Sequence, residues 1–213
     1  AFIGRSNVGK SSLLNMLSGK GDLARVSKTP GFTKLINVFT MNKTWRLVDL
    51  PGYGFAHVAR KDRSKFNQAV NDYLQHRTNL CCVFALLDSG LPPQKIDLVF
   101  VEWLARHAVP FVLVFTKIDR VTRAAVRANI EAFTDRISGW FEKLPVVFTC
   151  SATTAQGRQE LLGVIAEAMA AIQAESRQAP SDAGIPPEGL PATGQRVSAR
   201  PARGRRPNPA RPW

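Results

Sequence analysis

Short apolar runs alternate with longer amphipathic stretches along most of the chain. Runs rich in β-branched and aromatic residues predict strands at 1–3, 35–40, 45–49, 80–87, 110–116 and 146–149. Between them, apolar residues recur at spacings of three and four, which predicts helices through residues 13–17, 66–73, 96–107, 126–141 and 161–172. This alternation predicts an α/β domain whose sheet is covered by helices on both faces. Trp103 and Trp140 lie on or beside the helical stripes, so we expect both to fill the core or a groove.

The alternating pattern ends near residue 174. Residues 176–213 contain eight prolines, seven arginines and two acidic residues, with almost no large apolar side chains. Such a segment cannot bury a core, so we predict a domain at 1–174 and a disordered, basic, Pro/Arg-rich tail at 175–213. The tail is either a solvated extension or an arm that contacts RNA.

Charge and composition narrow the function classes. The formal net charge of +13 indicates a polyanionic partner, either nucleic acid or an acidic membrane surface. The apolar runs are far shorter than the ~20 residues of a membrane span, and no signal-peptide pattern opens the chain. Three cysteines lack metal-binding spacing, and Cys81 and Cys82 are predicted on one strand, pointing to opposite faces. We therefore expect reduced thiols, a cytoplasmic location and, from the opening AFIG, a truncated first strand.

The segment GRSNVGKS at residues 4–11 fits the phosphate-binding pattern G-x-x-x-x-G-K-[ST]. It follows a predicted strand and precedes a predicted helix, which is the context that the motif requires. Lys10 is expected to contact the β- and γ-phosphates, and the Ser11 hydroxyl to bind Mg²⁺. Glycines in such a loop let backbone N–H groups wrap closely around phosphates. The expected nucleotide contacts here are Gly4, Arg5, Ser6, Asn7, Val8, Gly9, Lys10, Ser11 and Ser12.

Two later segments have the order of γ-phosphate sensors. Thr33 lies in SKTPGFTKLIN, and its hydroxyl is expected to complete the Mg²⁺ shell when GTP is bound. Asp49 ends a predicted strand in VDLPGYGFA and is expected to hold Mg²⁺ through water, while the Gly52 N–H meets the γ-phosphate. Such loops order around the γ-phosphate and relax when it leaves. Lys10, Thr33 and Gly52 are therefore the candidate catalytic residues, and Ser11, Thr33 and Asp49 the candidate metal ligands.

The base is expected to be read at TKID, residues 116–119, directly after a predicted strand. The Asp119 carboxylate only accepts hydrogen bonds, and guanine offers it two donors where adenine offers none, which argues against an ATP-using enzyme. The alternative is that Asp119 merely caps a helix. The predicted base contacts are Thr116, Lys117 and Asp119, with Ser151 and Ala152 from CSAT at 150–153.

With these motifs in place, the chain resembles the EngB family of bacterial ribosome-assembly GTPases, also called YihA or YsxC, within the TRAFAC class. The resemblance rests on GRSNVGKSSLLN, SKTPGFTKLIN, VDLPGYGFA and TKID, and covers residues 1–173. It implies a P-loop G domain with a six-stranded, mixed, mostly parallel sheet and Mg²⁺-dependent GTP binding. It also implies slow hydrolysis of GTP to GDP by a monomer that helps to mature the large ribosomal subunit. The alternative is a non-catalytic, guanine-nucleotide-dependent factor that binds RNA or the ribosome.

Three features bear on how such a chain would hydrolyse GTP. Ras-like GTPases carry a water-orienting glutamine where this chain has Tyr53, so Tyr53 is expected to pack against the switch or a partner. In related GTPases that lack the glutamine, an asparagine at the position of Asn7 coordinates K⁺; otherwise Asn7 only braces the loop by hydrogen bonds. The basic stretch at 55–65 is either a solvated helix start or an RNA-facing switch.

Overall fold

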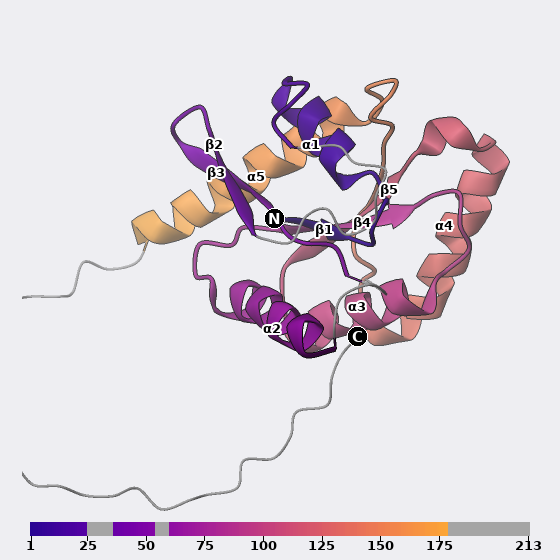
Figure 1. The fold of residues 1–213 in the computed structure, drawn as a ribbon, viewed down its shortest axis with the longest axis horizontal. Coiled ribbons are helices and arrows are strands. Elements are labelled where there is room, and N and C mark those ends of the chain that lie inside the picture. The colour runs from indigo at the N-terminus through magenta and orange to yellow at the C-terminus, as the bar shows by residue number, and fades with distance from the viewer. Residues whose placement is uncertain (25–35, 54–59, 179–213) are drawn as a thin grey trace, which may run out of the picture.

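The computed structural model describes residues 1–24, 36–53 and 60–178, except for the side chains of 60–67 and 175–178. These residues form six strands and five α-helices, and a strand is followed by an α-helix except where β3 directly follows β2 (Figure 1). The strands are β1 (Phe2–Gly4), β2 (Asn37–Met41), β3 (Trp45–Asp49), β4 (Val83–Asp88), β5 (Phe111–Thr116) and β6 (Val147–Thr149). The helices are α1 (Lys10–Ser18), α2 (Arg60–His76), α3 (Lys95–Arg106), α4 (Arg123–Ile137) and α5 (Arg158–Gln178), with short 3₁₀ turns η1 (Ile118–Arg120) and η2 (Ser138–Trp140).

The strands form one sheet in the order β2-β3-β1-β4-β5-β6. Strand β2 pairs antiparallel with β3, and every other neighbouring pair is parallel. The six-stranded, mixed, mostly parallel sheet that the resemblance to the EngB family implies is therefore confirmed. Parallel strands need long crossover connections, and the helices between them supply these.

Helices cover both faces of the sheet, as the alternating pattern predicted. Helices α1 and α5 pack on one face, with Leu13, Leu14 and Leu161 fully buried against β1, β4 and β5. Helices α2, α3 and α4 cover the other face (Figure 1). Phe100 and Phe133 belong to the buried apolar cluster on that face. Within the described residues, no helix combines the length and the apolar content of a membrane-spanning segment.

Two placements differ from the sequence predictions. Trp140 is 38% exposed rather than a core filler, because α4 ends at Ile137 and the helical spacing no longer applies to residues beyond it. Cys81 and Cys82 precede β4 instead of lying on it, since β4 begins at Val83, where its pairing with β5 begins. Trp103 does lie in the core, as predicted.

The structure also bears on the predictions for the cysteines and for the C-terminal tail. All three cysteines are free, and burial raises the pKa of the Cys150 thiol to about 12. Helix α5 continues to Gln178, which is beyond the domain boundary that we placed at 174. The predicted tail from 179 onward lies outside the described residues.

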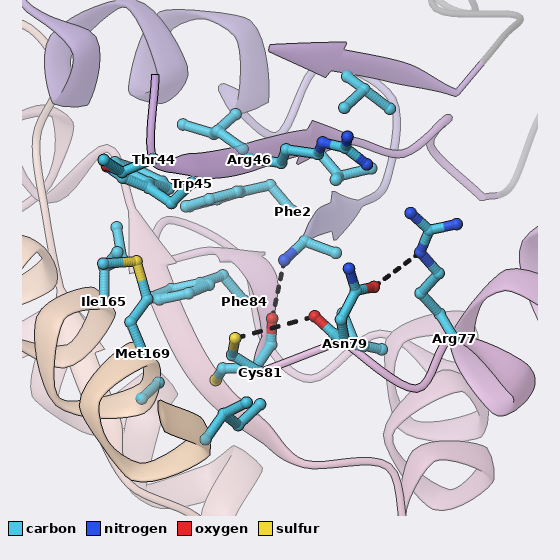
Figure 2. Close-up of a pocket in the computed structure, with 18 of the residues that line it drawn as sticks. Phe2, Thr44, Trp45, Arg46, Arg77, Asn79, Cys81, Phe84, Ile165 and Met169 are labelled. Atoms are coloured by element: carbon cyan, nitrogen blue, oxygen red, sulfur yellow. Dashed lines mark hydrogen bonds between the residues drawn. The ribbon is translucent and has the colours of Figure 1, made fainter. Parts of the chain in front are cut away.

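A cavity of about 700 Å³ opens at the amino ends of β1 and β4 (Figure 2). Its lining is mostly apolar and includes Phe2, Trp45, Phe84, Ile165 and Met169. At its rim, the Arg77 Nε donates a hydrogen bond to the Asn79 Oδ1 at 2.8 Å. Ligands of open α/β sheets bind outside the carboxyl ends of the strands. The cavity is thus at the opposite edge of the sheet from the predicted nucleotide motifs.

Candidate nucleotide-binding site

The predicted nucleotide motifs converge at one edge of the sheet. The loops after the parallel strands β1, β3, β5 and β6 contain residues 5–9, 50–53, 117–119 and 150–152, respectively. Because these strands are parallel, their carboxyl ends share an edge, and the loops after them lie side by side. Thr33 and most of SKTPGFTKLIN lie outside the described residues.

The phosphate-binding loop contains two residues with a left-handed backbone conformation, Asn7 and Gly9. Gly9 has a φ of 102° and directly precedes α1, so the loop delivers the N-terminus of that helix to the predicted phosphate site. Asn7 also has a left-handed φ, of 62°. Gly4 has a packing role besides the predicted phosphate contact, because a Cβ there would lie 2.7 Å from the Leu86 backbone oxygen. Gly4 therefore lets β1 pack against β4, in addition to any contact with phosphate.

Lys10 and Asp49 form a buried ion pair between the start of α1 and the end of β3. Burial lowers the pKa of Lys10, and the Asp49 carboxylate opposes that shift. The other Asp49 oxygen accepts a hydrogen bond from the Asn37 side chain at 3.4 Å, a contact that sequence reasoning missed. Asn37 is directly opposite Asp49 in the β2–β3 register, which the strand pattern alone does not reveal.

The residues in this corner fit a magnesium ion. A serine hydroxyl from Ser11 and a carboxylate from Asp49 are hard oxygen ligands of the kind Mg²⁺ prefers. Asp49 is only 2% exposed, so its charge requires a cation nearby, which Lys10 supplies in the structure. The buried Ser6 Oγ, in the same loop, has no hydrogen-bond partner within the described residues.

Gly52 is pressed against the phosphate-binding loop. A Cβ at this position would lie 2.7 Å from the Gly4 oxygen and 3.3 Å from the Ser6 nitrogen. The Leu50 N–H donates to the Phe2 oxygen at 3.0 Å, and the Tyr53 N–H donates to the Gly4 oxygen at 3.3 Å. The chain after β3 thus runs along the first residues of the loop, where the predicted γ-phosphate contact requires Gly52 to be.

Side chains from the TKID segment join the base loop to the phosphate loop. The Lys117 Nζ donates to the Asn7 oxygen and to the Asp88 Oδ2, each at 2.6 Å. The Thr116 Oγ1 donates to the Val8 oxygen at 2.6 Å. Asp88 was not predicted as a site residue, although it ends β4 at the same edge. These contacts fix the two loops relative to each other.

Asp119 lies at the surface beside the CSAT loop. Hydrogen bonding to the Ser151 side chain is the main cause that lowers the pKa of Asp119, so this carboxyl is ionised at neutral pH. Ser151 is fully buried, and its Oγ accepts from the backbone N–H groups of Thr153 and Thr154. The alternative that Asp119 caps a helix is wrong, because the N-cap of α4 is Thr122, whose side chain accepts from the Ala125 N–H.

The sheet order, the phosphate-binding loop and the TKID segment define a P-loop GTPase. A family described as "50S ribosome-binding GTPase" matches residues 1–117. The "Probable GTP-binding protein EngB" of Phocaeicola vulgatus is 48% identical over 165 residues, which cover 78% of this chain and 82% of the relative. That of Cytophaga hutchinsonii is 48% identical over 167 residues, covering 78% and 84%. The chain therefore belongs to the EngB family of GTP-binding proteins.

Solved structures agree on the fold. The crystal structure of a probable GTP-binding protein EngB aligns with a TM-score of 0.61 and 24% identity, covering 80% of this chain and 97% of that one. Era, crystallised with MgGDPNP and nucleotides 1506–1542 of 16S ribosomal RNA, aligns with a TM-score of 0.63 and 18% identity, covering 91% and 58%. The chain is a GTP-hydrolysing enzyme with guanine nucleotides as ligands, as the description of the matching family as a GTPase indicates.

Proposed function

We propose that this chain acts in the cytoplasm, as a monomer, as a GTP-driven switch in assembly of the large ribosomal subunit. The observation that carries this proposal is the match of residues 1–117 to a family described as 50S ribosome-binding GTPases. The net charge of +13 suits a partner made largely of RNA. In this cycle the GTP-bound chain binds the precursor particle, and hydrolysis releases it.

The site residues have distinct proposed roles in this cycle. Backbone N–H groups of the phosphate-binding loop and the start of α1 bind the phosphates, and Lys10 places positive charge at the β- and γ-phosphates. Gly52 presents its N–H to the γ-phosphate, and Asp119 accepts the two guanine donors, with Lys117 along the base. Ser11, Asp49 and Thr33 would hold Mg²⁺, which when bound neutralises charge on the phosphates.

The charge that an arginine finger supplies elsewhere is proposed to come from K⁺ held by Asn7. Asn7 is exposed, with its backbone in the left-handed region, and its backbone oxygen accepts a hydrogen bond from Lys117. Over the described residues its side chain makes no hydrogen bond, which weakens the view that Asn7 merely braces the loop. An amide oxygen presented in this way is a suitable ligand for a hard cation.

Replacing Na⁺ by K⁺ at constant ionic strength should raise GTP turnover at least several-fold. Asn7→Ala should remove that increase while leaving GDP affinity within about two-fold, because the cation acts on charge that develops in the transition state. Turnover in the two salts, with Asn42→Ala at an exposed position of left-handed φ as the control asparagine, tests this. Equal wild-type rates in Na⁺ and K⁺ would assign the missing charge to the ribosomal partner instead.

The basic stretch that leads into α2 is the proposed RNA contact. Helix α2 begins at Arg60, so Arg60, Lys61 and Arg63 fall in its first turn. Cations there oppose the helix dipole, so the helix itself gains nothing from them. A polyanionic partner would explain their presence.

Arg60→Glu/Lys61→Glu should weaken binding to large ribosomal subunits by at least ten-fold and flatten its salt dependence. Free GTP affinity should stay nearly unchanged. Co-sedimentation of GTP-analogue-loaded protein across a salt series measures both effects, and Arg123→Glu/Arg127→Glu on α4 serves as a matched charge control. Unaltered subunit binding by the α2 variant would rule out this contact.

A further inference from the structure

Three side chains from distant parts of the sequence meet beside the predicted γ-phosphate site. Arg5 belongs to the phosphate-binding loop, Tyr53 follows β3, and Asp97 lies in the first turn of α3. The Tyr53 hydroxyl donates to the Asp97 Oδ1 at 2.9 Å, and the Arg5 Nε donates to the Asp97 Oδ2 at 3.0 Å. Each carboxylate oxygen therefore has its own donor, from a different loop of the site.

Two members of this cluster are buried, and the Arg5 side chain is 24% exposed. Tyr53 and Asp97 are each 3% exposed, and the Tyr53 ring packs on the Phe100 ring with centroids 4.6 Å apart. Burial raises the pKa of Asp97, and the Arg5 charge and both hydrogen bonds oppose that shift. A buried ion pair adds little net stability compared with apolar packing, but it fixes the geometry of the groups it joins.

The cluster holds two backbone segments together, the one at Arg5 and the one at Tyr53. Arg5 and Tyr53 form a parallel β-bridge, so the two donors to Asp97 come from paired backbone segments. Gly52 lies between this bridge and β3, where a Cβ would come within 2.7 Å of the Gly4 oxygen and 3.3 Å of the Ser6 nitrogen. Asp97 thus pins both segments to α3 at the point where Gly52 meets the phosphate-binding loop.

We propose that Asp97, through Tyr53 and Arg5, is a positioning residue for the γ-phosphate: it holds the Gly52 N–H in place and so favours GTP over GDP. This inference rests on the proposed contact of Gly52 with the γ-phosphate. It gives Tyr53 a role that differs from that of the Ras-like glutamine, because a tyrosine buried against α3 orients backbone rather than water. GDP has no γ-phosphate, so its affinity is expected to be independent of the hydrogen bond between Tyr53 and Asp97.

Tyr53→Phe removes one hydrogen bond to Asp97 and keeps the ring, and Arg5→Met removes the other donor while keeping an unbranched side chain. We expect each to lower the preference for a non-hydrolysable GTP analogue over GDP, by about five-fold for Tyr53→Phe and ten-fold or more for Arg5→Met. Turnover of GTP should fall in the same order. Tyr73→Phe is the matched control, since Tyr73 is the other tyrosine of the chain and lines the cavity at the opposite edge.

Calorimetry of each variant with GDP and with the GTP analogue distinguishes a positioning role for Asp97 from a purely structural one. A purely structural role predicts that Tyr53→Phe weakens GDP and the GTP analogue equally or lowers only the melting temperature, and either result would overturn the proposal. Gly52→Ala separates the inference from its premise. If Gly52→Ala lowers the GTP preference and Tyr53→Phe does not, the γ-phosphate contact stands and the positioning role fails. If Gly52→Ala also leaves the preference unchanged, both are wrong.

Discussion

Asp119→Asn should lower GTP affinity by about 100- to 1,000-fold and move the preference of the site towards xanthosine triphosphate. The carboxylate can accept both guanine donors, whereas an amide offers one acceptor and turns its own N–H₂ towards the second donor. Losing one charge-assisted hydrogen bond and leaving a donor unpaired accounts for a change of this size. Xanthine has a carbonyl at the 2-position, which can accept from the new amide.

Competition between GTP and xanthosine triphosphate for a fluorescent guanine nucleotide measures this change. Asp135→Asn, an exposed acid on α4, is the control and should leave the preference intact. An unchanged preference for GTP in Asp119→Asn would mean that the base is read elsewhere. The lowered pKa of Asp119 adds a second expectation: the carboxyl stays ionised below its usual range, so base choice should persist in mildly acidic buffer.

Gly157→Ala should destabilise the fold by at least ~3 kcal/mol. Gly157 has a φ of 80°, which costs an alanine ~1–2 kcal/mol. Its Cβ would lie 2.2 Å from the Thr149 oxygen and 3.1 Å from the Cys150 Cα, so backbone must move. The displaced backbone belongs to the loop in which the Ser151 N–H donates to the Gln156 oxygen, and guanine-nucleotide affinity should therefore fall as well.

Urea unfolding measures the free energy of unfolding of Gly157→Ala and of its control, Gly163→Ala. Both variants add the same methyl group, but at positions with opposite surroundings. Gly163 lies within α5, and nothing is within 4 Å of a Cβ built there. Alanine in a helix is favoured over glycine by ~1 kcal/mol, so Gly163→Ala should stabilise the protein. Similar unfolding free energies for the two variants would show that Gly157 has more room than its contacts indicate.

The fold was largely predictable because its signals are local. Each strand and helix has its own apolar spacing, and the phosphate-binding and TKID segments are contiguous in sequence. Errors arose where that spacing was extended past the end of an element, as for Trp140 beyond α4 and for Cys81 before β4.

The supporting contacts of the site could not be predicted, because they join residues far apart in the sequence. Tyr53 and Asp97 are 44 positions apart, and Arg5 and Asp97 are 92 apart. An isolated aspartate in the first turn of a helix has the same sequence signature whether it is solvated or buried. Asp88 and Asn37 were missed for the same reason, since only strand order and register bring them to Lys117 and Asp49.

The most direct test is GTP turnover by the purified chain, alone and with purified large-subunit precursors or small subunits. We expect slow turnover that depends on Lys10, and a rise of at least ten-fold with large-subunit precursors but not with small subunits. Lys10→Ala should show no such rise. Turnover that is unaffected by large-subunit precursors, or that responds equally to small subunits, would contradict a GTP-driven role in assembly of the large subunit.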